Sequence, residues 1–473
     1  MKSLLFCLVL YSLTASNYAL ACSEHELSKS ALDQMLDDIV AGNYQGHIGP
    51  IFKKPKESVM RNLVWRVSHV DDMLFGVTIG MGSWALGLNK RAYKDIRDLA
   101  DGKEVKKIHT WRGDVKRKYV FFSDHHYLGF AKKHDYFRTW EQNTSASNKI
   151  ESLDIYKHAL NNYNDKEYTL VELGDVEDLV TIEPTLKGAA IDQLFDFFAM
   201  PLGEIFDEKF EDKNKQIQLL DIFYNYWDLY DQVGKTFVAN DRFVKVLGNH
   251  DAALKKPKFL KMLRKMYHKD IDVYDYAIIE GPNPDGSSKY AKFISAHGHQ
   301  FDPWTNPRIA KLVGEAFTQS EAWFGNGADR IWPKSEGGSG GWKAFMNKEV
   351  GFDNRLALAP SMKKEKGEMA KFRHMGEMNI ERRMNKTFQG APQIPTLILG
   401  HTHEPKIGAL AKNGKQFNGY VNTGATGHYE QLIWCVEVVD GTASVWAWYV
   451  DNHGKIIKQK MQATKDGRLI PEA

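Results

Sequence analysis

Five short apolar runs, each followed directly by residues that can bind a metal ion, constrain this chain more than any other feature of its sequence. Each run has four to six mostly β-branched or aromatic residues and ends in a turn signal, which predicts a buried strand. The runs are Tyr119–Phe122, Tyr168–Leu173, Phe243–Leu247, Phe293–Ala296 and Thr396–Leu399. Because ligands bind beyond the carboxyl ends of the strands in α/β sheets, five polar clusters in these places predict one shared site.

The residues that follow the runs are mainly carboxylates and imidazoles. They form the clusters Asp124-His125-His126, Gly174-Asp175-Val176-Glu177-Asp178, Gly248-Asn249-His250-Asp251, His297-Gly298-His299 and Gly400-His401-Thr402-His403. Oxygen and imidazole ligands suit Mn, Fe, Zn, Co or Mg rather than the metals that prefer thiolates. In extended backbone, residues two apart point the same way, so we expect the pairs Asp124/His126 and His401/His403 each to face one site. Glycines within the clusters are expected to let the backbone turn sharply near a bound ion.

Each cluster also has a purely structural interpretation. An isolated D-x-H is often only hydrogen-bonded, G-D-V-E-D can be a turn before a capped helix, and H-G-H can be surface histidine. A structural turn, however, needs neither the histidine of G-N-H-D nor those of G-H-T-H. Because all five clusters follow apolar runs, their shared context favours a metal site.

In its order along the chain, the series D-x-H, G-D-x-x-D, G-N-H-D, H and G-H-x-H resembles that of the calcineurin-like metallophosphoesterases. Asn422-Thr423-Gly424 also resembles the closing strand and turn of that family. The resemblance implies an α/β fold of two packed mixed β-sheets flanked by helices, a β-sandwich with α-β-β-α layers and helical insertions. It is specific to the fold and the metal site but not to a substrate.

The resemblance further implies two divalent metal ions, bridged by Asp175. The implied ligands are Asp124, His126 and His403 for one ion, and Asn249, His297 and His401 for the other. His250 is the implied general acid, oriented by Asp251. His299 is an alternative to His297 as a ligand, and His125 is expected to point away from the metals.

The expected activity is that of a hydrolase, a phosphatase or phosphodiesterase acting on a phosphate monoester or diester. Two ions about 3.5–4 Å apart would clamp the phosphoryl group, and a hydroxide bridging them would attack phosphorus. His250 would then protonate the leaving oxygen. The alternatives are a non-catalytic metal-binding scaffold on the same fold and a nuclease. The DHH phosphoesterases, suggested by Asp124-His125-His126, have no place for G-N-H-D and G-H-T-H.

The charge balance bears on the partners. The chain has 63 Lys and Arg against 60 Asp and Glu, a net charge of +3. A chain this balanced has no global attraction to nucleic acid, so we expect a phosphate ester substrate and no dedicated nucleic-acid partner.

The N-terminus predicts export. Lys2, an apolar run over 4–13 and Ala19-Leu20-Ala21 have the order of a signal peptide over residues 1–21, although an N-terminal helix is the alternative. Cleavage after Ala21 would leave Cys22 first, where it is a candidate for a lipid anchor despite an imperfect match to a lipidation signal. In a bacterium the product would be periplasmic or a membrane-anchored lipoprotein. A disulfide between Cys22 and Cys435 is conceivable.

The length of 473 residues allows two or three domains, or one large domain with insertions. We expect an N-terminal extension over 22–117, a metallophosphoesterase domain over 118–450 with insertions at about 185–240 and 303–390, and a C-terminal tail over 451–473. Core packing is expected for the helical-spaced apolar residues Leu219, Leu220, Ile222 and Phe223. The segment 303–362 is either an aromatic lid over the site or a long surface loop.

Overall fold

The computed structural model describes residues 29–45, 89–127, 150–179, 208–283, 286, 289–301, 380–410, 416–427, 431–451, 453–463 and 469–472. The expected signal peptide, Cys22 and the candidate lid at 303–362 lie outside these residues, as does the first part of the insertion at 185–240.

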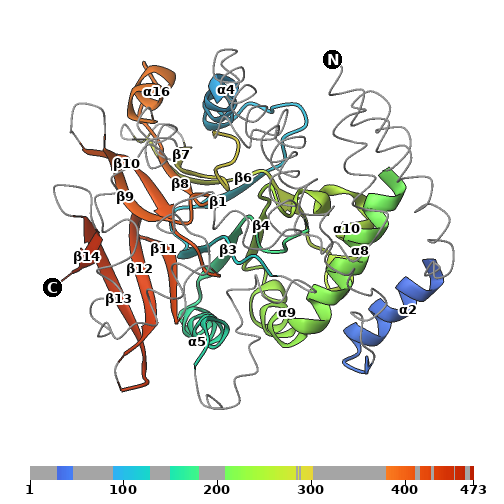
Figure 1. The fold of residues 1–473 in the computed structure, drawn as a ribbon. Helices are drawn as coiled ribbons and strands as arrows, with labels where there is room; N and C mark the ends of the chain where they lie inside the picture. The colour runs from blue at the N-terminus through green and yellow to red at the C-terminus, as the bar shows by residue number, and fades with distance from the viewer. Residues whose placement is uncertain are drawn as a thin grey trace, which may run out of the picture.

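Two β-sheets form the centre of the described chain (Figure 1). In spatial order, the six-stranded sheet consists of β1 (Thr110–Asp114), β6 (Tyr276–Pro282), β7 (Lys289–Ser295), β8 (Thr396–Leu399), β10 (Gln416–Thr423) and β9 (Pro405–Leu410). The eight-stranded sheet consists of β14 (Leu469–Pro471), β13 (Ile456–Ala463), β12 (Thr442–Val450), β11 (Leu432–Val439), β2 (Tyr119–Phe122), β3 (Thr169–Leu173), β4 (Phe243–Val246) and β5 (Val273–Tyr274). Both sheets mix parallel and antiparallel pairs, as expected.

Helices cover the outer face of each sheet. The eight-stranded sheet is covered by α5 (Ser152–Asp165), α8 (Glu208–Asn225), α9 (Trp227–Val233) and α10 (Pro257–Met266), and the six-stranded sheet by α4 (Asn89–Ala100) and α16 (Ile380–Thr387). A further helix, α2 (Lys29–Val40), packs on α8 and α10, and short helices η3 (Gly234–Val238) and η4 (Ala252–Lys255) complete the described elements. The predicted α-β-β-α layering is therefore confirmed. Among the described residues, no helix is both long enough and apolar enough to cross a membrane.

The strand β2 shows why its sequence is apolar throughout. Tyr119 and Phe121 pack between the two sheets, whereas Val120 and Phe122 pack against the helices. Side chains alternate across a strand, so a strand that is covered on both faces has no position for a solvated residue.

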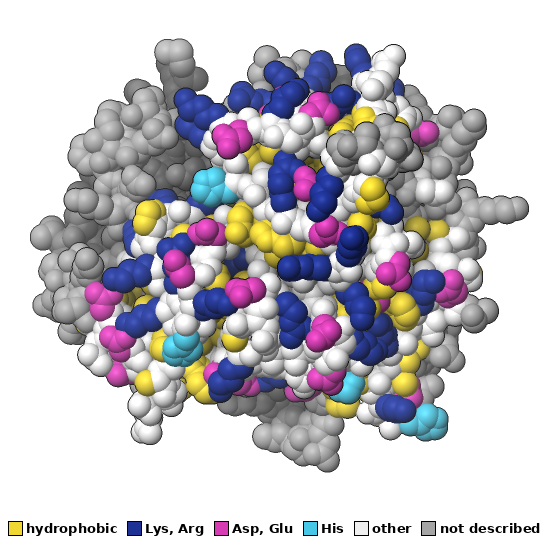
Figure 2. All heavy atoms as spheres, turned by 180° about the vertical axis from the view of Figure 1, so that it is seen from behind, with side chains coloured by type: hydrophobic (Ala, Val, Ile, Leu, Met, Phe, Trp, Pro, Cys, Tyr) yellow, Lys and Arg dark blue, Asp and Glu magenta, His cyan; other side chains and the backbone are white. Residues whose placement is uncertain are grey.

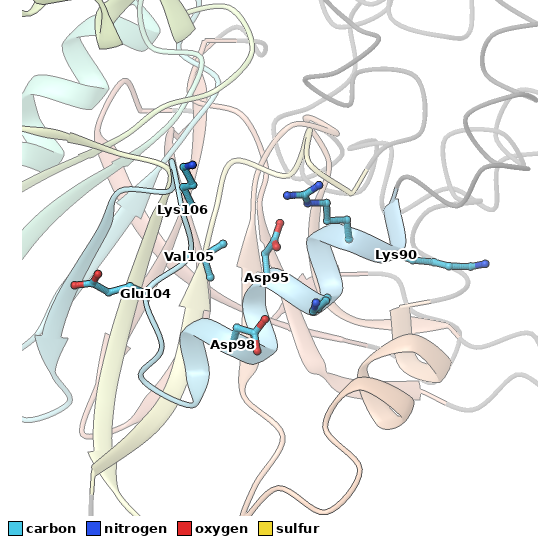
Figure 3. Close-up of a pocket in the computed structure, with 8 residues that line it drawn as sticks. Lys90, Asp95, Asp98, Glu104, Val105 and Lys106 are labelled. Carbon is cyan, nitrogen blue, oxygen red and sulfur yellow. The ribbon is translucent and has the colours of Figure 1, made fainter.

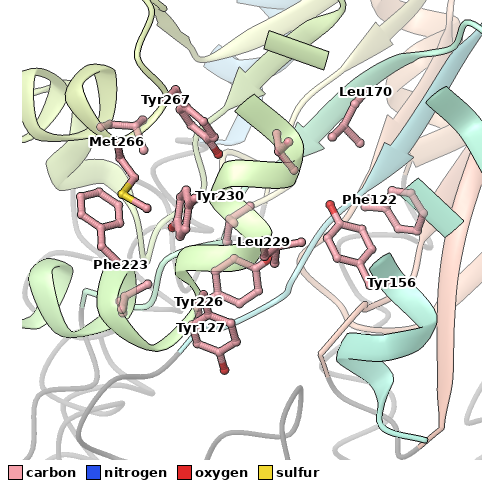
Figure 4. Close-up of a cluster of buried hydrophobic side chains, with 14 of the residues drawn as sticks. Phe122, Tyr127, Tyr156, Leu170, Phe223, Tyr226, Leu229, Tyr230, Met266 and Tyr267 are labelled. Carbon is pink, nitrogen blue, oxygen red and sulfur yellow. The ribbon is translucent and has the colours of Figure 1, made fainter. Parts of the chain in front are cut away.

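The helical layer beside β2 is rich in aromatic residues. Figure 4 shows Tyr226, between α8 and α9, and Tyr230 of α9 near Tyr127, with Phe223 of α8 beside Met266, and the rings of Tyr127 and Tyr226 stack at 4.5 Å. Each aromatic side chain buries a large apolar area, so this layer supplies much of the hydrophobic stabilisation of the fold. The residues expected to form core in this insertion, Leu219, Leu220, Ile222 and Phe223, are fully buried, which confirms that interpretation.

The sheets extend beyond the expected limits of the domain. Within the expected N-terminal extension, β1 pairs in parallel with β6, and α4 packs on the six-stranded sheet. Within the expected C-terminal tail, β13 and β14 extend the eight-stranded sheet from β12. Because these segments share hydrogen-bonded ladders with the centre of the fold, the two-sheet unit begins before residue 118 and ends after residue 450.

Candidate metal centre

The polar clusters meet where strands from both sheets end. Asp124, Asp175 and Asn249 follow β2, β3 and β4 of the eight-stranded sheet, and His297 and His401 follow β7 and β8 of the six-stranded sheet. The centre therefore lies between the carboxyl ends of strands from two sheets rather than along the edge of one.

The first group of potential ligands consists of Asp124, His126 and His403, whose ligand atoms all lie within 4.8 Å of one another. Asp124 Oδ1 is 3.2 Å from His403 Nε2 and 3.9 Å from His126 Nε2. The two imidazole Nε2 atoms are 3.2 Å apart. One carboxylate oxygen and two imidazole nitrogens thus converge on one point.

The second group consists of Asp175, His297 and His401, also within 4.8 Å. Asp175 Oδ2 is 3.0 Å from His297 Nε2 and 3.9 Å from His126 Nε2, which belongs to the first group. A single oxygen of Asp175 thus faces both groups. This is the position that the implied bridging role requires.

Three buried polar atoms, Asp124 Oδ1 and His297 Nε2 of these groups and Asn249 Oδ1 after β4, make no well-formed hydrogen bond within the described part of the chain, although the first two lie close to His403 and Asp175. Buried polar atoms are ordinarily hydrogen-bonded, so their convergence needs a further partner. The second polar atom of Asp124 and that of His297 are already hydrogen-bonded. Asp124 Oδ2 accepts from Ser123 Oγ at 2.5 Å and from the His401 backbone N–H at 3.0 Å. His297 Nδ1 donates to the Leu173 carbonyl oxygen at 2.9 Å, which leaves Nε2 as the ring nitrogen that faces the centre. These oxygen and imidazole atoms fit divalent metal ions.

The electrostatics agree with this fit. Burial lowers the pKa of His297, but the carboxylates of Asp175 and Asp124 outweigh burial and raise the pKa to about 9. The two buried carboxylates thus create a negative potential that favours a cation at this point.

The backbone reaches the centre through an unusual conformation. Asp124, His126, Asp175, His401 and His403 have φ angles of 53°, 49°, 52°, 70° and 60°. Non-glycine residues rarely adopt this left-handed region, and where they do the strain is often at a functional site. The extended backbone that we expected for the pairs Asp124/His126 and His401/His403 is therefore wrong, because the chain turns immediately after each strand. In addition, His401 and His403 belong to different groups.

His250 lies beside both groups. Its Nδ1 is 3.0 Å from Asp178 Oδ1, and its Nε2 is 4.0 Å from Asp175 Oδ2. Burial lowers the pKa of His250, but Asp178 and then Asp175 outweigh burial and raise it to about 10. Asp178 also lies 3.3 Å from His126 Nδ1, so it contacts one potential ligand and the expected acid.

A sequence model of the calcineurin-like phosphoesterases matches residues 117–405, which is more than half of the chain. The chain belongs to the calcineurin-like phosphoesterase family. Among curated proteins and solved structures, none matches the chain significantly. The family and the Asp/His groups together support a metal-dependent phosphoesterase, and a member of this family acts on phosphate esters.

In this phosphoesterase, Asp251 does not have the place that we expected beside the His250 ring. Its Oδ1 accepts from the Gly248 N–H at 2.6 Å, and its Oδ2 accepts from the Val176 N–H at 3.1 Å. Burial raises the pKa of Asp251 to about 7. Asp251 thus ties the loop after β4 to the loop after β3, while the carboxylate beside His250 Nδ1 is that of Asp178.

The two remaining histidines of the clusters differ in their surroundings. His125 is fully buried, and its ring packs edge-on against Tyr156 and Tyr127. The ring of His299 lies 5.6 Å from that of His297 and 6.5 Å from that of His401. His299 therefore lies beside the second group, whereas His297 is within it.

The buried residue Lys245, near the metal centre, was not predicted from the sequence. Lys245 Nζ on β4 lies 2.8 Å from Glu172 Oε2 on β3 and 2.9 Å from Glu177 Oε2. The Tyr230 hydroxyl donates to Glu177 Oε1 at 2.7 Å. Glu177 stands between Asp175 and Asp178, so this ionic cluster supports the loop that carries both. The sequence does contain a sign of this cluster, because two consecutive apolar runs each hold one charged residue, Glu172 in the first and Lys245 in the second.

A cavity of about 640 Å³ lies elsewhere, along α4 and the segment after it (Figure 3). Its lining mixes basic and acidic side chains: Lys90, Arg91, Lys94, Asp95, Asp98, Glu104, Val105 and Lys106. None of the metal-centre residues lines it, so it is separate from the phosphoesterase site.

Proposed function

We propose that this chain is a secreted dinuclear-metal phosphoesterase that hydrolyses a phosphate monoester or diester with His250 as general acid. The observation that carries this proposal is the arrangement around Asp175 Oδ2. That oxygen lies within 4.0 Å of ring nitrogens of His126, His297 and His250, one from each ligand group and one from the acid.

Asp124, His126 and His403 would hold one ion, Asn249, His297 and His401 the other, and Asp175 both. When bound, two divalent ions would supply Lewis-acid stabilisation of phosphoryl charge and a water of lowered pKa. The protein residues supply the proton. His250 is held through Nδ1 by Asp178, and the carboxylates of Asp178 and Asp175 raise its pKa, which favours the protonated ring that can protonate the leaving oxygen.

The near-balanced charge of the chain is the reason that we propose a phosphate ester rather than a nucleic acid as the substrate. On the face seen in Figure 2, Lys and Arg side chains are interspersed with Asp and Glu. A nucleic-acid partner selects for a continuous basic surface, which an alternating surface of this kind does not offer.

Hydrolysis of p-nitrophenyl phosphate, bis-p-nitrophenyl phosphate and an alkyl phosphate by Mn²⁺-loaded and chelator-treated protein tests this proposal. We expect turnover that requires metal, and the preferred ester distinguishes a phosphatase from a phosphodiesterase. His250→Ala should retain metal and lose about 10²–10⁴-fold on the alkyl phosphate. Its loss on the nitrophenyl esters should be smaller, because nitrophenolate leaves without protonation.

His109→Ala, which removes an exposed histidine, is the matched control and should retain wild-type rates. Unchanged turnover of the alkyl phosphate by His250→Ala would remove the role of general acid. Wild-type protein that binds two ions but hydrolyses no ester would favour the non-catalytic scaffold.

The order of a basic residue, an apolar run and Ala19-Leu20-Ala21, which is that of a signal peptide, supports the proposal of export. Mass spectrometry of the chain from a bacterial host should find a mature N-terminus at Cys22, in the soluble or the membrane fraction. A mass increment of a lipid on Cys22 would establish the anchor, whereas an intact N-terminus at Met1 would contradict export by cleavage.

A further inference from the structure

The last two residues of β10 and the turn that follows them, residues 422–427, contact both halves of the metal centre. They lie beyond residue 405, where the family match ends. We call this segment the β10 turn. Its contacts run to the loop after β8, which carries His401 and His403, and to the segment after β2, which carries Asp124 and His126.

Asn422 connects the β10 turn to the loop after β8. Its side chain is fully buried. Asn422 Nδ2 lies 2.8 Å from the Gly400 carbonyl oxygen and 3.2 Å from Thr402 Oγ1, and Oδ1 accepts from the Gly424 N–H at 2.9 Å. One amide thus contacts the residue on either side of His401, through the Gly400 backbone and the Thr402 side chain.

Thr423 connects the β10 turn to Asp124 through Ser123. Ser123 Oγ lies 2.6 Å from Thr423 Oγ1 and 2.5 Å from Asp124 Oδ2. A carboxylate only accepts, so Ser123 donates to Asp124 and Thr423 donates to Ser123. This chain of hydroxyl groups ends on the oxygen of Asp124 that faces away from the ligand group. It therefore orients Oδ1 towards His403.

Backbone hydrogen bonds also join the β10 turn to the segment after β2. The Thr426 N–H donates to the Ser123 carbonyl oxygen at 3.0 Å, and the Gly427 N–H donates to that of Asp124 at 3.1 Å. A Cβ on Gly427 would lie 1.9 Å from the His125 carbonyl oxygen, so only glycine permits this approach.

We propose that Ser123, Asn422 and Thr423 are positioning residues that set the metal affinity of the centre. Asp124 comes from the eight-stranded sheet and His401 and His403 from the six-stranded sheet, and the β10 turn is hydrogen-bonded to both segments. The spacing between these ligands therefore depends on the three side chains. Partners that orient metal ligands typically contribute 10–100-fold to metal affinity. The inference rests on the proposed function in so far as it requires the centre to bind metal.

The decisive comparison is Ser123→Ala with Ser295→Ala. Both changes remove a buried serine hydroxyl, but Ser295 Oγ has no hydrogen-bond partner among the described residues, although it lies two residues before His297. Mn²⁺ binding to chelator-treated protein is followed by the EPR signal of free Mn²⁺, and the spectrum of bound Mn²⁺ reports ligand geometry. We expect Ser123→Ala to weaken at least one site by about 10–100-fold and to change the bound spectrum. Ser295→Ala should match the wild type in both respects.

Unchanged affinity and an unchanged spectrum in Ser123→Ala would overturn the inference alone. Wild-type protein that takes up no Mn²⁺ would overturn the metal centre and the inference with it. Asn422→Ala tests the contact between the β10 turn and the loop after β8. It should also weaken Mn²⁺ binding, and near-ultraviolet circular dichroism of the metal-free variant checks that it is folded. A folded Asn422→Ala with wild-type affinity would contradict the role of Asn422.

Discussion

The two halves of the metal centre differ in charge and in what supports them. The eight-stranded sheet supplies every carboxylate of the two ligand groups, Asp124 and Asp175, whereas the six-stranded sheet supplies only imidazoles. Behind the carboxylate half lies the buried ionic cluster of Lys245, Glu172 and Glu177. The imidazole half is held by the neutral amide of Asn422. Lys245 thus offsets negative charge beside the loop that carries Asp175 and Asp178, whereas Asn422 contacts the loop of His401 and His403 through hydrogen bonds without a buried ion pair of its own.

The largest effect is expected on the carboxylate side. Lys245→Met would leave Glu172 and Glu177 buried without their cation, and should lower the free energy of unfolding by about 3–5 kcal/mol. Urea unfolding of metal-free protein measures this. Lys235→Met is the control, because Lys235 pairs with Asp231 on the surface and such pairs contribute only about 0–1 kcal/mol. Equal losses in the two variants would show that the buried cluster does not stabilise this half.

Asp178 and Asp251, the other two acidic residues of the carboxylate half, are expected to differ in what their substitution changes, and both changes should be smaller than that of Lys245→Met. Asp178→Asn should lower kcat/KM on an alkyl phosphate by about 10–100-fold, since Asp178 holds the His250 ring. It should also move the alkaline limb of the pH profile to lower pH, because removal of a carboxylate that raises the pKa of His250 lets that pKa fall.

Asp251→Asn is the matched variant. It should instead lower the free energy of unfolding by about 1–3 kcal/mol, because its carboxylate accepts two buried backbone N–H groups. A rate loss in Asp251→Asn that exceeds that of Asp178→Asn at unchanged stability would return the orienting role to Asp251.

The smallest effect is expected on the imidazole side. Thr423→Val removes one neutral hydroxyl and should lower the free energy of unfolding by about 0.5–1.5 kcal/mol. Thr423→Ser retains the hydroxyl and should cost less. Thermal unfolding of metal-free protein compares the two. If Thr423→Val proved as damaging as Lys245→Met, the contrast between an ionic and a neutral half would not hold.

Much of the fold was predictable from the sequence because burial on both faces leaves a strand mostly apolar. The runs that became β2, β3, β4, β7 and β8 were recognised for this reason, and so were the polar residues at their ends. The limits of the domain were less predictable. The strands β1 and β13 contain charged residues, and they join the sheets through backbone hydrogen bonds that leave little trace in the side-chain pattern.

The details of the site depended on contacts between distant residues. The family resemblance implied Asp251 as the orienting residue, yet the loop after β3 brings Asp178 to the His250 ring. The link between Lys245 and Glu172 is a cross-strand pair, which appears only once β3 and β4 are placed in register. Five potential ligands have left-handed backbone. The sequence does not indicate this conformation, because aspartate and histidine rarely adopt it.

The hydrogen bond between Ser123 and Thr423 joins residues 300 apart in the chain. During synthesis, the ribosome releases the carboxylate ligands long before the last imidazoles and the turn that holds them to Asp124. The centre therefore cannot be completed until almost the whole chain has emerged. A contact of such long range must also overcome a large loss of chain entropy on closure, which other parts of the fold reduce by forming first. Metal capture should thus be a late event in the maturation of this protein, and a chain that ends before the β10 turn would carry the ligands without the means to hold them together.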